Sequence, residues 1–258
     1  MKQYIVDAFT DKIISGNPAA VCVLESFPSE EIMQSIAAEN NLSETAFVVK
    51  ENDRYHIRWF TPKSEIDFCG HATLATAFVL FNYYAQEVDT LNLYGQVGEF
   101  TVLRAGDLIR MEFPEYKLEH IEITDTMIEA LGTIPMAAYK DRDILFVLRD
   151  EDEVRDIQPD MELISKLDGA CVAVTAKGLD YDCVSRVFAP RYGMNEDQVT
   201  SSTHCMIAPY WSRRVNKPSI TAFQASSRTG ILYCECIGDK VIISGKAVLF
   251  SINDIVAL

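Results

Sequence analysis

The stretch Arg58-Trp59-Phe60-Thr61-Pro62 has a counterpart in Arg186-Val187-Phe188-Ala189-Pro190, 128 residues further along a chain of 258 (186 − 58). An interval close to half the chain indicates an internal duplication. With a three-residue insertion allowed, Cys69-Gly70-His71-Ala72-Thr73 aligns with Thr200-Ser201-Ser202-Thr203-His204. Each copy then contains a strand, a turn, an irregular loop and the start of a helix. The sequence therefore predicts two similar lobes.

The fold class follows from the hydrophobic pattern on either side of this repeat. Short runs of β type recur along both halves, whereas few stretches show helical spacing. Residues 71–84 predict a helix that is apolar almost all round, and such a helix is normally buried. We expect an α+β protein with lobes at 1–114 and 115–258, in which the last strands can pack back on the first lobe.

Both aligned loops end at a predicted helix start that is rich in small residues. The free N–H groups and the positive dipole end of a helix make its N-terminus an anion site. If the two lobes face each other, both termini point into one cleft and can hold a carboxylate or an enolate-like oxyanion. The sequence thus favours a small anionic ligand.

Composition excludes several classes of partner. The formal charge of −15 makes binding to nucleic-acid phosphates or to anionic membrane surfaces unfavourable. The longest strongly apolar stretch, 74–81, is far shorter than the ~18 residues that a membrane span needs. The seven cysteines are odd in number and lack a repeating interval, which is typical of reduced thiols. We expect a cytoplasmic protein that binds neither nucleic acid nor membranes.

Patterns for metals and organic cofactors are missing from the sequence. The tight pair Cys234-x-Cys236 lies in a predicted strand, where alternate side chains point to opposite faces. The four histidines show no ligand spacing, and neither standard Gly-rich phosphate loop is present. We expect neither a metal nor an organic cofactor.

Several motifs together resemble one known family. They are Gly16-Asn17-Pro18-Ala19-Ala20-Val21, Ser43-Glu44-Thr45-Ala46-Phe47, Cys69-Gly70-His71-Ala72-Thr73, Glu196-Asp197-x-Val199-Thr200-x-Ser202, Pro209-Tyr210-Trp211 and Gln224-Ala225-Ser226-Ser227-Arg228. In this order and at this spacing they resemble the phenazine-biosynthesis PhzF-like family, which is related to diaminopimelate epimerase and proline racemase. The resemblance implies two pseudo-symmetric lobes, each a β-barrel-like sheet wrapped round a central helix.

The resemblance also implies a function and a set of site residues. Glu44 matches the family's catalytic acid/base, and His71 and Asp197 match groups that orient the substrate or relay a proton. Gly70, Ser201, Ser202, Thr200 and Asn17 are implied in binding the substrate. The implied protein is a homodimeric, cofactor-independent isomerase that moves a proton on a small carboxylate-bearing metabolite. In Thr200-Ser201-Ser202 the residue Ser201 replaces the family's usual glycine, which bears on substrate identity.

Two other functions compete with this one. Cys69 occupies the position where related epimerases carry the first of two catalytic thiols, but its partner position is Thr200, whose hydroxyl is too weak an acid for that chemistry. A two-base racemase that uses Cys69 is therefore the second enzymatic hypothesis. The third is a non-catalytic binding protein that keeps the lobes. Convergence of Glu44, His71 and Asp197 on one enclosed pocket would favour the acid/base isomerase.

Overall fold

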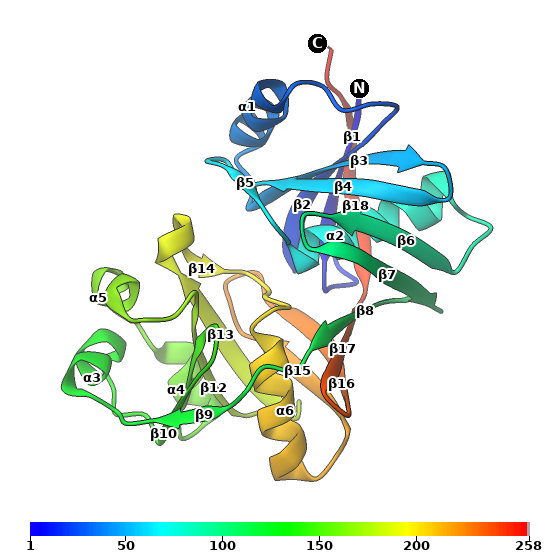
Figure 1. Ribbon diagram of the computed structural model, residues 1–258. Helices are drawn as coiled ribbons and strands as arrows, with labels where there is room; N and C mark the ends of the chain where they lie inside the picture. Colours follow the sequence, from blue (N-terminus) through cyan, green and yellow to red (C-terminus); the bar gives the residue numbers. More distant parts are fainter. Residues whose placement is uncertain (257–258) are drawn as a thin grey trace. The chain divides into compact units, whose positions relative to one another are not determined.

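The computed structural model describes residues 1–256, and the chain forms two compact units. The first unit combines Met1–Glu112 with the C-terminal segment from Ser244, and the second is Phe113–Ile243. The expected boundary at residue 114 lies two residues from this division, and the last strand belongs to the first unit. Figure 1 shows the elements of each unit in the colours of the sequence.

The first unit is a strongly twisted sheet of many strands around one buried helix (Figure 1). Its helices are α1 (Glu30–Asn40) and α2 (Gly70–Val79), and α2 continues into a π-helical turn at Leu80–Tyr84. Its strands are β1 (Lys2–Ala8), β2 (Asn17–Leu24), β3 (Glu44–Glu51), β4 (Arg54–Phe60), β5 (Glu65–Ile66), β6 (Thr90–Gly95), β7 (Gly98–Ala105) and β18 (Ala247–Asp254). Strand β8 (Leu108–Pro114) carries the chain into the second unit.

The second unit also packs strands around a helix. Its strands are β9 (Glu119–Ile121), β10 (Ala137–Lys140), β11 (Ile144–Val147), β12 (Val172–Lys177), β13 (Cys183–Ala189), β14 (Met194–Asp197), β15 (Ser219–Gln224), β16 (Gly230–Ile237) and β17 (Lys240–Gly245), the last of which returns the chain to the first unit. Its helices are α3 (Asp125–Leu131), α4 (Glu151–Asp156), α5 (Met161–Lys166), a 3₁₀ turn at Pro190–Tyr192 and α6 (His204–Val215).

Strand pairing shows that the two units repeat one topology. In the first unit, β2 runs parallel to β3, β4 runs antiparallel to both β3 and β5, and β4 runs parallel to β6. In the second unit, β11 runs parallel to β12, β13 runs antiparallel to both β12 and β14, and β13 runs parallel to β15. The sequence repeat is therefore a repeat of strand order and direction.

The duplicated Arg-x-Phe stretches carry the same side-chain contacts in both units. Arg58 on β4 forms two hydrogen bonds of 2.7 Å with Glu65 on β5, and its guanidinium lies 5.2 Å from the ring centre of Phe60. Arg186 on β13 bonds Glu196 on β14 at 2.8 and 2.9 Å and lies 5.1 Å from the ring centre of Phe188. Bidentate Arg–carboxylate pairs fix geometry as well as contributing energy. Each pair ties the strand to the short strand that precedes the loop.

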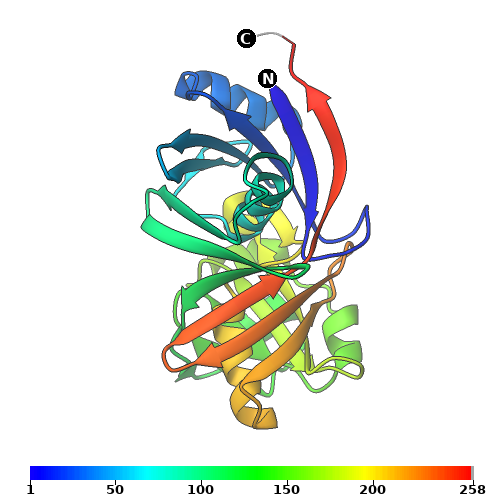
Figure 2. The same cartoon turned by 90° about the vertical axis from the view of Figure 1, so that its right-hand side faces the viewer.

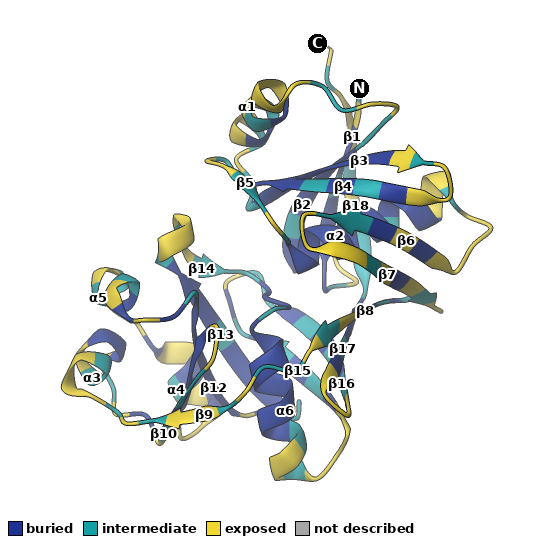
Figure 3. Ribbon diagram, in the orientation of Figure 1, coloured by how far each residue is buried: buried dark blue, intermediate teal, exposed yellow. Residues whose placement is uncertain are grey.

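The central helices are buried, as their composition predicts. Nine of the ten residues of α2 are buried, and so is the N-terminal two-thirds of α6, from His204 to Trp211 (Figure 3). A helix that lacks a polar face is stable only when other elements cover it on all sides. In the first unit β18 pairs with β1 in antiparallel orientation. Figure 2 shows β1 in blue and β18 in red. Gly245, just before β18, approaches α2 so closely that an added Cβ would lie 3.1 Å from Leu74.

Candidate active site

The first unit gathers four of the residues singled out in the sequence into one buried group, which we call the Glu44 cluster: Asn17, Glu44, Cys69 and His71. Glu44 is the first residue of β3, and Asn17 is the first residue of β2. Cys69 is the N-cap of α2 and His71 lies in its first turn. Two neighbouring parallel strands and one helix N-terminus thus meet at this point.

Local backbone geometry fixes Asn17. Gly16 adopts a φ of +65°, and a Cβ added there would lie 2.2 Å from the carbonyl oxygen of Ala8. Only glycine can turn the chain here without strain. The turn brings Asn17 into register with Ala8 on β1, and its side chain is completely buried. The Gly-Asn-Pro motif therefore has a structural reason as well as a chemical one.

His71 stands at the centre of the cluster, with a neighbour at each ring nitrogen. Its Nε2 lies 3.0 Å from Oε2 of Glu44. Its Nδ1 lies 3.1 Å from Nδ2 of Asn17 and 3.4 Å from Sγ of Cys69. Glu44 and His71 are only 7% and 5% exposed. A carboxylate, an imidazole and a thiol thus lie close together in a site that is shielded from water.

The Glu44–His71 contact is short, but its geometry does not meet the criteria for a hydrogen bond. Oε2 of Glu44 and Nε2 of His71 are both buried atoms without a hydrogen-bond partner. Leaving a buried polar atom unsatisfied costs roughly 1–3 kcal/mol. Such atoms in a native structure call for an explanation, and a reacting ligand that supplies the missing partner is one. The pair is therefore poised to contact a third group.

The electrostatic field of the cluster favours a positive charge on His71. Burial lowers the pKa of the imidazole, but the neighbouring Cys69 and Glu44 outweigh burial, so that the pKa of His71 is raised well above 6.5. Burial and the charge of Glu44 raise the pKa of the Cys69 thiol to about 11. Because Cys69 keeps its proton at neutral pH, Glu44 is the group that stabilises the imidazolium there.

The same residue types occur in metal sites, and one donor atom from each of Glu44, Cys69 and His71 lies within 4.8 Å of the others. The thiol, however, faces Nδ1 of the imidazole whereas the carboxylate faces Nε2. Donor atoms this close together suit an ion as well as proton transfer, so the expectation that the protein binds no metal stays a prediction.

The second unit holds the other predicted residues in a loop that runs from Asp197 to His204, which we call the Asp197 loop. Thr200 donates its hydroxyl to Oδ2 of Asp197 at 2.6 Å. Thr200 and Ser201 are buried, and Ser202 and Asp197 are partly exposed. The carbonyls of Ser201 and Ser202 accept N–H groups from the first turn of α6. The loop thus joins β14 to the helix N-terminus as the repeat predicts.

Two buried residues that the sequence analysis did not assign hold this loop in shape. Gln224 accepts the Thr200 N–H at 2.8 Å and donates to the Asp197 carbonyl at 2.7 Å. His204 donates from Nδ1 to the Thr200 carbonyl at 2.7 Å, since a carbonyl can only accept. The signal for Gln224 was available: Ile220, Ala222 and Gln224 alternate on the buried face of β15, where an amide needs partners.

Asp143 supports the same helix start from the opposite side. Its carboxylate is completely buried, accepts the Thr203 hydroxyl at 2.7 Å and accepts the Cys171 N–H at 3.1 Å. Burial raises the pKa of Asp143. Nothing in the sequence marks this residue, because a single aspartate before a β run looks like an ordinary turn residue.

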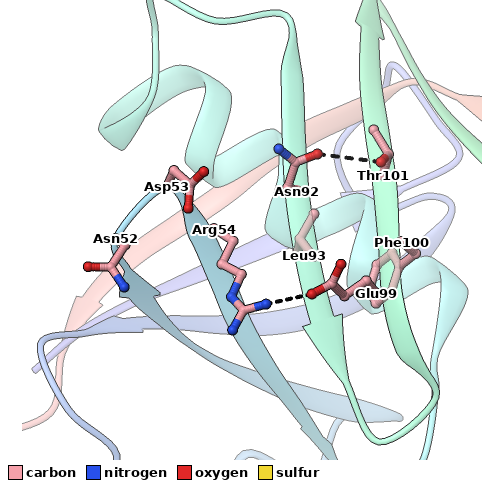
Figure 4. Close-up of a pocket in the computed structure, with 8 residues that line it drawn as sticks. All are labelled: Asn52, Asp53, Arg54, Asn92, Leu93, Glu99, Phe100 and Thr101. Carbon is pink, nitrogen blue, oxygen red and sulfur yellow. Dashed lines mark hydrogen bonds and ion pairs between the residues drawn. The ribbon is translucent and has the colours of Figure 1, made fainter.

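The structure brings Asn17, Glu44, Gly70 and His71 together in the first unit, and Asp197, Thr200, Ser201 and Ser202 together in the second. That the two groups serve one substrate stays a prediction. A polar hollow of about 470 Å³ lies elsewhere in the first unit, between β4, β6 and β7 (Figure 4). Arg54 and Glu99 pair across it, and none of the predicted site residues lines it.

Comparison with known proteins identifies the family of the chain. The family model described as "Phenazine biosynthesis-like protein" matches residues 6–252. The chain belongs to this family. An uncharacterized isomerase of Pseudomonas aeruginosa is 45% identical over 245 residues, covering 95% of each chain. The crystal structure of a PhzF-family protein from Enterococcus faecalis has a TM-score of 0.97 and 48% identity and covers 99% of each chain.

A more distant structure extends the fold beyond the family. A probable proline racemase from Agrobacterium radiobacter has a TM-score of 0.63 at 10% identity, with coverage of 99% of this chain and 92% of that one. This confirms the predicted α+β fold of the PhzF and racemase type. The relatives also confirm the enzyme class: the PhzF-family chain is an isomerase. Among the described residues, no helix is long and apolar enough to cross a membrane.

Proposed function

We propose that this PhzF-family protein is a cofactor-independent isomerase that moves a proton on a small carboxylate-bearing metabolite, with Glu44 as the general acid/base. The observation that carries the proposal is the buried Oε2 of Glu44, which has no hydrogen-bond partner and lies 3.0 Å from Nε2 of His71. A carboxylate that is shielded from water, with one oxygen that lacks a hydrogen bond beside an imidazole, can accept a proton from carbon and return it elsewhere.

The chain's own groups support each part of such a step. Glu44 takes the proton from the carbon next to the substrate carboxylate, and the electron pair left on carbon delocalises onto the carboxylate oxygens. The N-terminal N–H groups of α2, which have no intrahelical acceptor, stabilise negative charge there. His71, whose pKa is raised well above 6.5, supplies a positive charge beside Glu44. In a substrate with a carbon–carbon double bond conjugated to this anion, the electron pair also reaches the far carbon of that bond. The protonated Glu44 then delivers the proton to this far carbon, and the double bond shifts toward the carbon that was deprotonated.

The racemase hypothesis places the base at Cys69 instead. The thiolate is the reactive form of cysteine, and a thiol with a pKa of about 11 is almost entirely protonated at neutral pH. Its expected partner Thr200 donates its hydroxyl to Asp197. Both observations favour Glu44 over Cys69 as the base.

The binding-protein hypothesis does not account for the unpaired atoms. A scaffold that only binds a partner gains nothing from burying a carboxylate oxygen and an imidazole nitrogen without hydrogen bonds, because each costs stability. Strained polar groups of this kind are concentrated at catalytic sites. The loss of stability is explained if catalytic turnover depends on these two atoms.

The decisive experiment is a screen of carboxylate metabolites for exchange of carbon-bound hydrogen in deuterated water, followed by Glu44→Gln and Cys69→Ser variants. The glutamine is nearly isosteric but cannot carry a proton, so exchange should fall by about 10²–10⁴-fold or more. Cys69→Ser should stay within roughly tenfold of wild type, a change of about 1.4 kcal/mol in the barrier. Wild-type exchange in Glu44→Gln together with loss in Cys69→Ser would replace this proposal with the racemase.

A further inference from the structure

The side chain of Asn17 is completely buried, and its Nδ2 lies 3.1 Å from Nδ1 of His71. An amide nitrogen carries two hydrogens and no lone pair for accepting, so in this orientation it can only donate. With the amide in this orientation Nδ1 is the acceptor, and Nε2, which faces the acceptor oxygen Oε2 of Glu44 at 3.0 Å, carries the proton. In a neutral imidazole one nitrogen accepts and the other carries the proton.

We propose that Asn17 is a positioning residue that sets the tautomer of His71 together with Oε2 of Glu44, keeping the proton of the neutral ring on Nε2. The side of the ring that faces Glu44 then carries an N–H and not a lone pair. It serves as a hydrogen-bond donor, and Glu44 is left as the only base of the pair. This inference deepens the proposed function and rests on it for its catalytic meaning.

The turn before β2 makes Asn17 suitable for this task. Gly16 at a φ of +65° and the register of Asn17 with Ala8 hold the amide against the ring. The amide can also serve the charged ring, because a half-turn about its last bond presents Oδ1 as an acceptor for a protonated Nδ1. Asn17 can therefore partner both protonation states of His71, which an aliphatic side chain cannot do.

The chain offers an internal contrast in His204. There Nδ1 faces the carbonyl of Thr200 at 2.7 Å, and a carbonyl has no hydrogen to donate. Neutral His204 therefore carries its proton on Nδ1, which is the opposite tautomer to the one proposed for His71. Burial lowers the pKa of His204 to about 4, so it stays neutral throughout the useful range.

Two titratable groups shift the pKa of His71 upward. Glu44 from β3 and Cys69 from the segment before α2 are the groups that raise the pKa of His71. Strand β1 also packs against α2; its Tyr4 pairs with Tyr84, and its Asp7 accepts the N–H of Ile14. Cys69 also contacts Nδ1, so the test must separate its effect from that of Asn17.

The test is ¹⁵N NMR of the full chain with labelled histidine, in which long-range couplings report which ring nitrogen is protonated. Only four histidines are present, and His71→Gln assigns the signal in question. We expect neutral His71 to carry its proton on Nε2 and His204 to carry it on Nδ1. Asn17→Leu should shift His71 toward the Nδ1 tautomer and lower its pKa. Asn17→Asp should raise its pKa by about 1–3 pH units, as a nearby opposite charge does.

Cys69→Ala is the matched control and should leave the tautomer on Nε2. Hydrogen-exchange protection of the α2 amides reports whether the first unit keeps its fold in each variant. A wild-type His71 with its proton on Nδ1, or a tautomer that follows Cys69→Ala and ignores Asn17→Leu, overturns the proposal. If the wild-type ring stays charged up to the alkaline limit of the titration, an Asn17→Leu variant whose ring also stays charged up to that limit overturns the proposal equally. No substrate is needed, so this result is independent of whether Glu44 catalyses proton transfer.

Discussion

At the scale of residues, the two buried histidines show how neighbouring groups determine the charge of an imidazole that is shielded from water. Burial alone lowers the pKa of both rings. Next to His204 stands a neutral carbonyl, which offsets burial only in part, and its pKa falls to about 4. Next to His71 stand Cys69 and Glu44, which raise its pKa well above 6.5. His204 is therefore a neutral residue that stabilises a loop, and His71 is a charged residue of the candidate active site.

These opposite shifts give opposite dependences of stability on pH. The raised pKa of His71 adds stability that is fully present below about pH 6.5 and is lost as pH rises through the folded-state value. The lowered pKa of His204 adds stability that is fully present above 6.5 and is lost as pH falls toward about 4.

The prediction concerns His204, where the folded pKa of about 4 and the ordinary value of 6.5 bound the window. Between these values the free energy of unfolding should fall with decreasing pH, by roughly 3 kcal/mol from this group. Urea unfolding of wild type and His204→Gln at several pH values measures it. The variant should be less stable overall but should lose less stability on acidification. Parallel curves for the two proteins would contradict the assignment.

Residue chemistry was only partly predictable from the sequence. Glu44 and His71 could be singled out because the family resemblance marks them, and the structure brings them within 3.0 Å. Gln224 was quoted within a motif without a role, because its function depends on which loop lies beside β15. Asp143 was missed for the same reason: its partner Thr203 lies 60 residues away in sequence. A contact between distant segments has no local signal.

At the scale of elements, the repeat predicted both central helices and the loops that precede them. The helix expected over 71–84 is found, but its regular α form ends at Val79 and a π-helical turn follows to Tyr84. The Ala85 N–H bonds the Leu80 carbonyl at 2.7 Å, five residues back. Apolar periodicity cannot distinguish a π turn from an α turn, because the difference is one residue in the hydrogen-bond pattern.

Gln224 gives an element-scale prediction, since its side chain bonds both the Asp197 carbonyl and the Thr200 N–H of the Asp197 loop. Gln224→Leu keeps the volume roughly constant but leaves the buried Thr200 N–H without its acceptor, at a cost of about 1–3 kcal/mol. Hydrogen exchange at the Thr200 amide should therefore be about tenfold or more faster, while amides of the first unit are unchanged. Gln224→Glu, which keeps the acceptor but not the donor, should be intermediate. Unchanged exchange at Thr200 in the leucine variant would remove Gln224 from this role.

At the scale of the whole molecule, one duplicated topology carries two different chemistries. Thr45 pairs with Phe60 in the first unit and Val172 pairs with Phe188 in the second, so the residue before each, Glu44 or Cys171, occupies the equivalent position. Glu44 ends in an unsatisfied carboxylate, whereas burial raises the pKa of the Cys171 thiol and keeps it protonated. Both copies contain the strands and the arginine–carboxylate pairs, but only the first copy carries an acid at this position. This asymmetry is what a single acid/base mechanism requires.

The assignment of β18 to the first unit leads to the last prediction. Strand β18 pairs along β1 from Ala8↔Ala247 to Lys2↔Asp254, and β1 contributes the buried Tyr4, Val6 and Ala8 to the core. A chain truncated after Ile243 loses this strand and the contact of Gly245 with α2, which leaves one edge of β1 unpaired. Several lost hydrogen bonds at about 1 kcal/mol each, together with the lost apolar burial, approach the 5–15 kcal/mol by which a domain is stable.

Hydrogen exchange followed by mass spectrometry distinguishes the two units in such a truncated chain. We expect residues 1–112, including α2 and the Glu44 cluster, to lose protection, because the sheet that encloses α2 is incomplete without β18. Amides of β12, β13 and α6 in the second unit should stay protected, since their own core, around Phe146, Val174 and Phe188, contains no residue beyond 243. Equal loss of protection in both units would mean that they unfold as one cooperative body. Full protection of α2 would mean that β18 is dispensable for enclosing the acid/base residues.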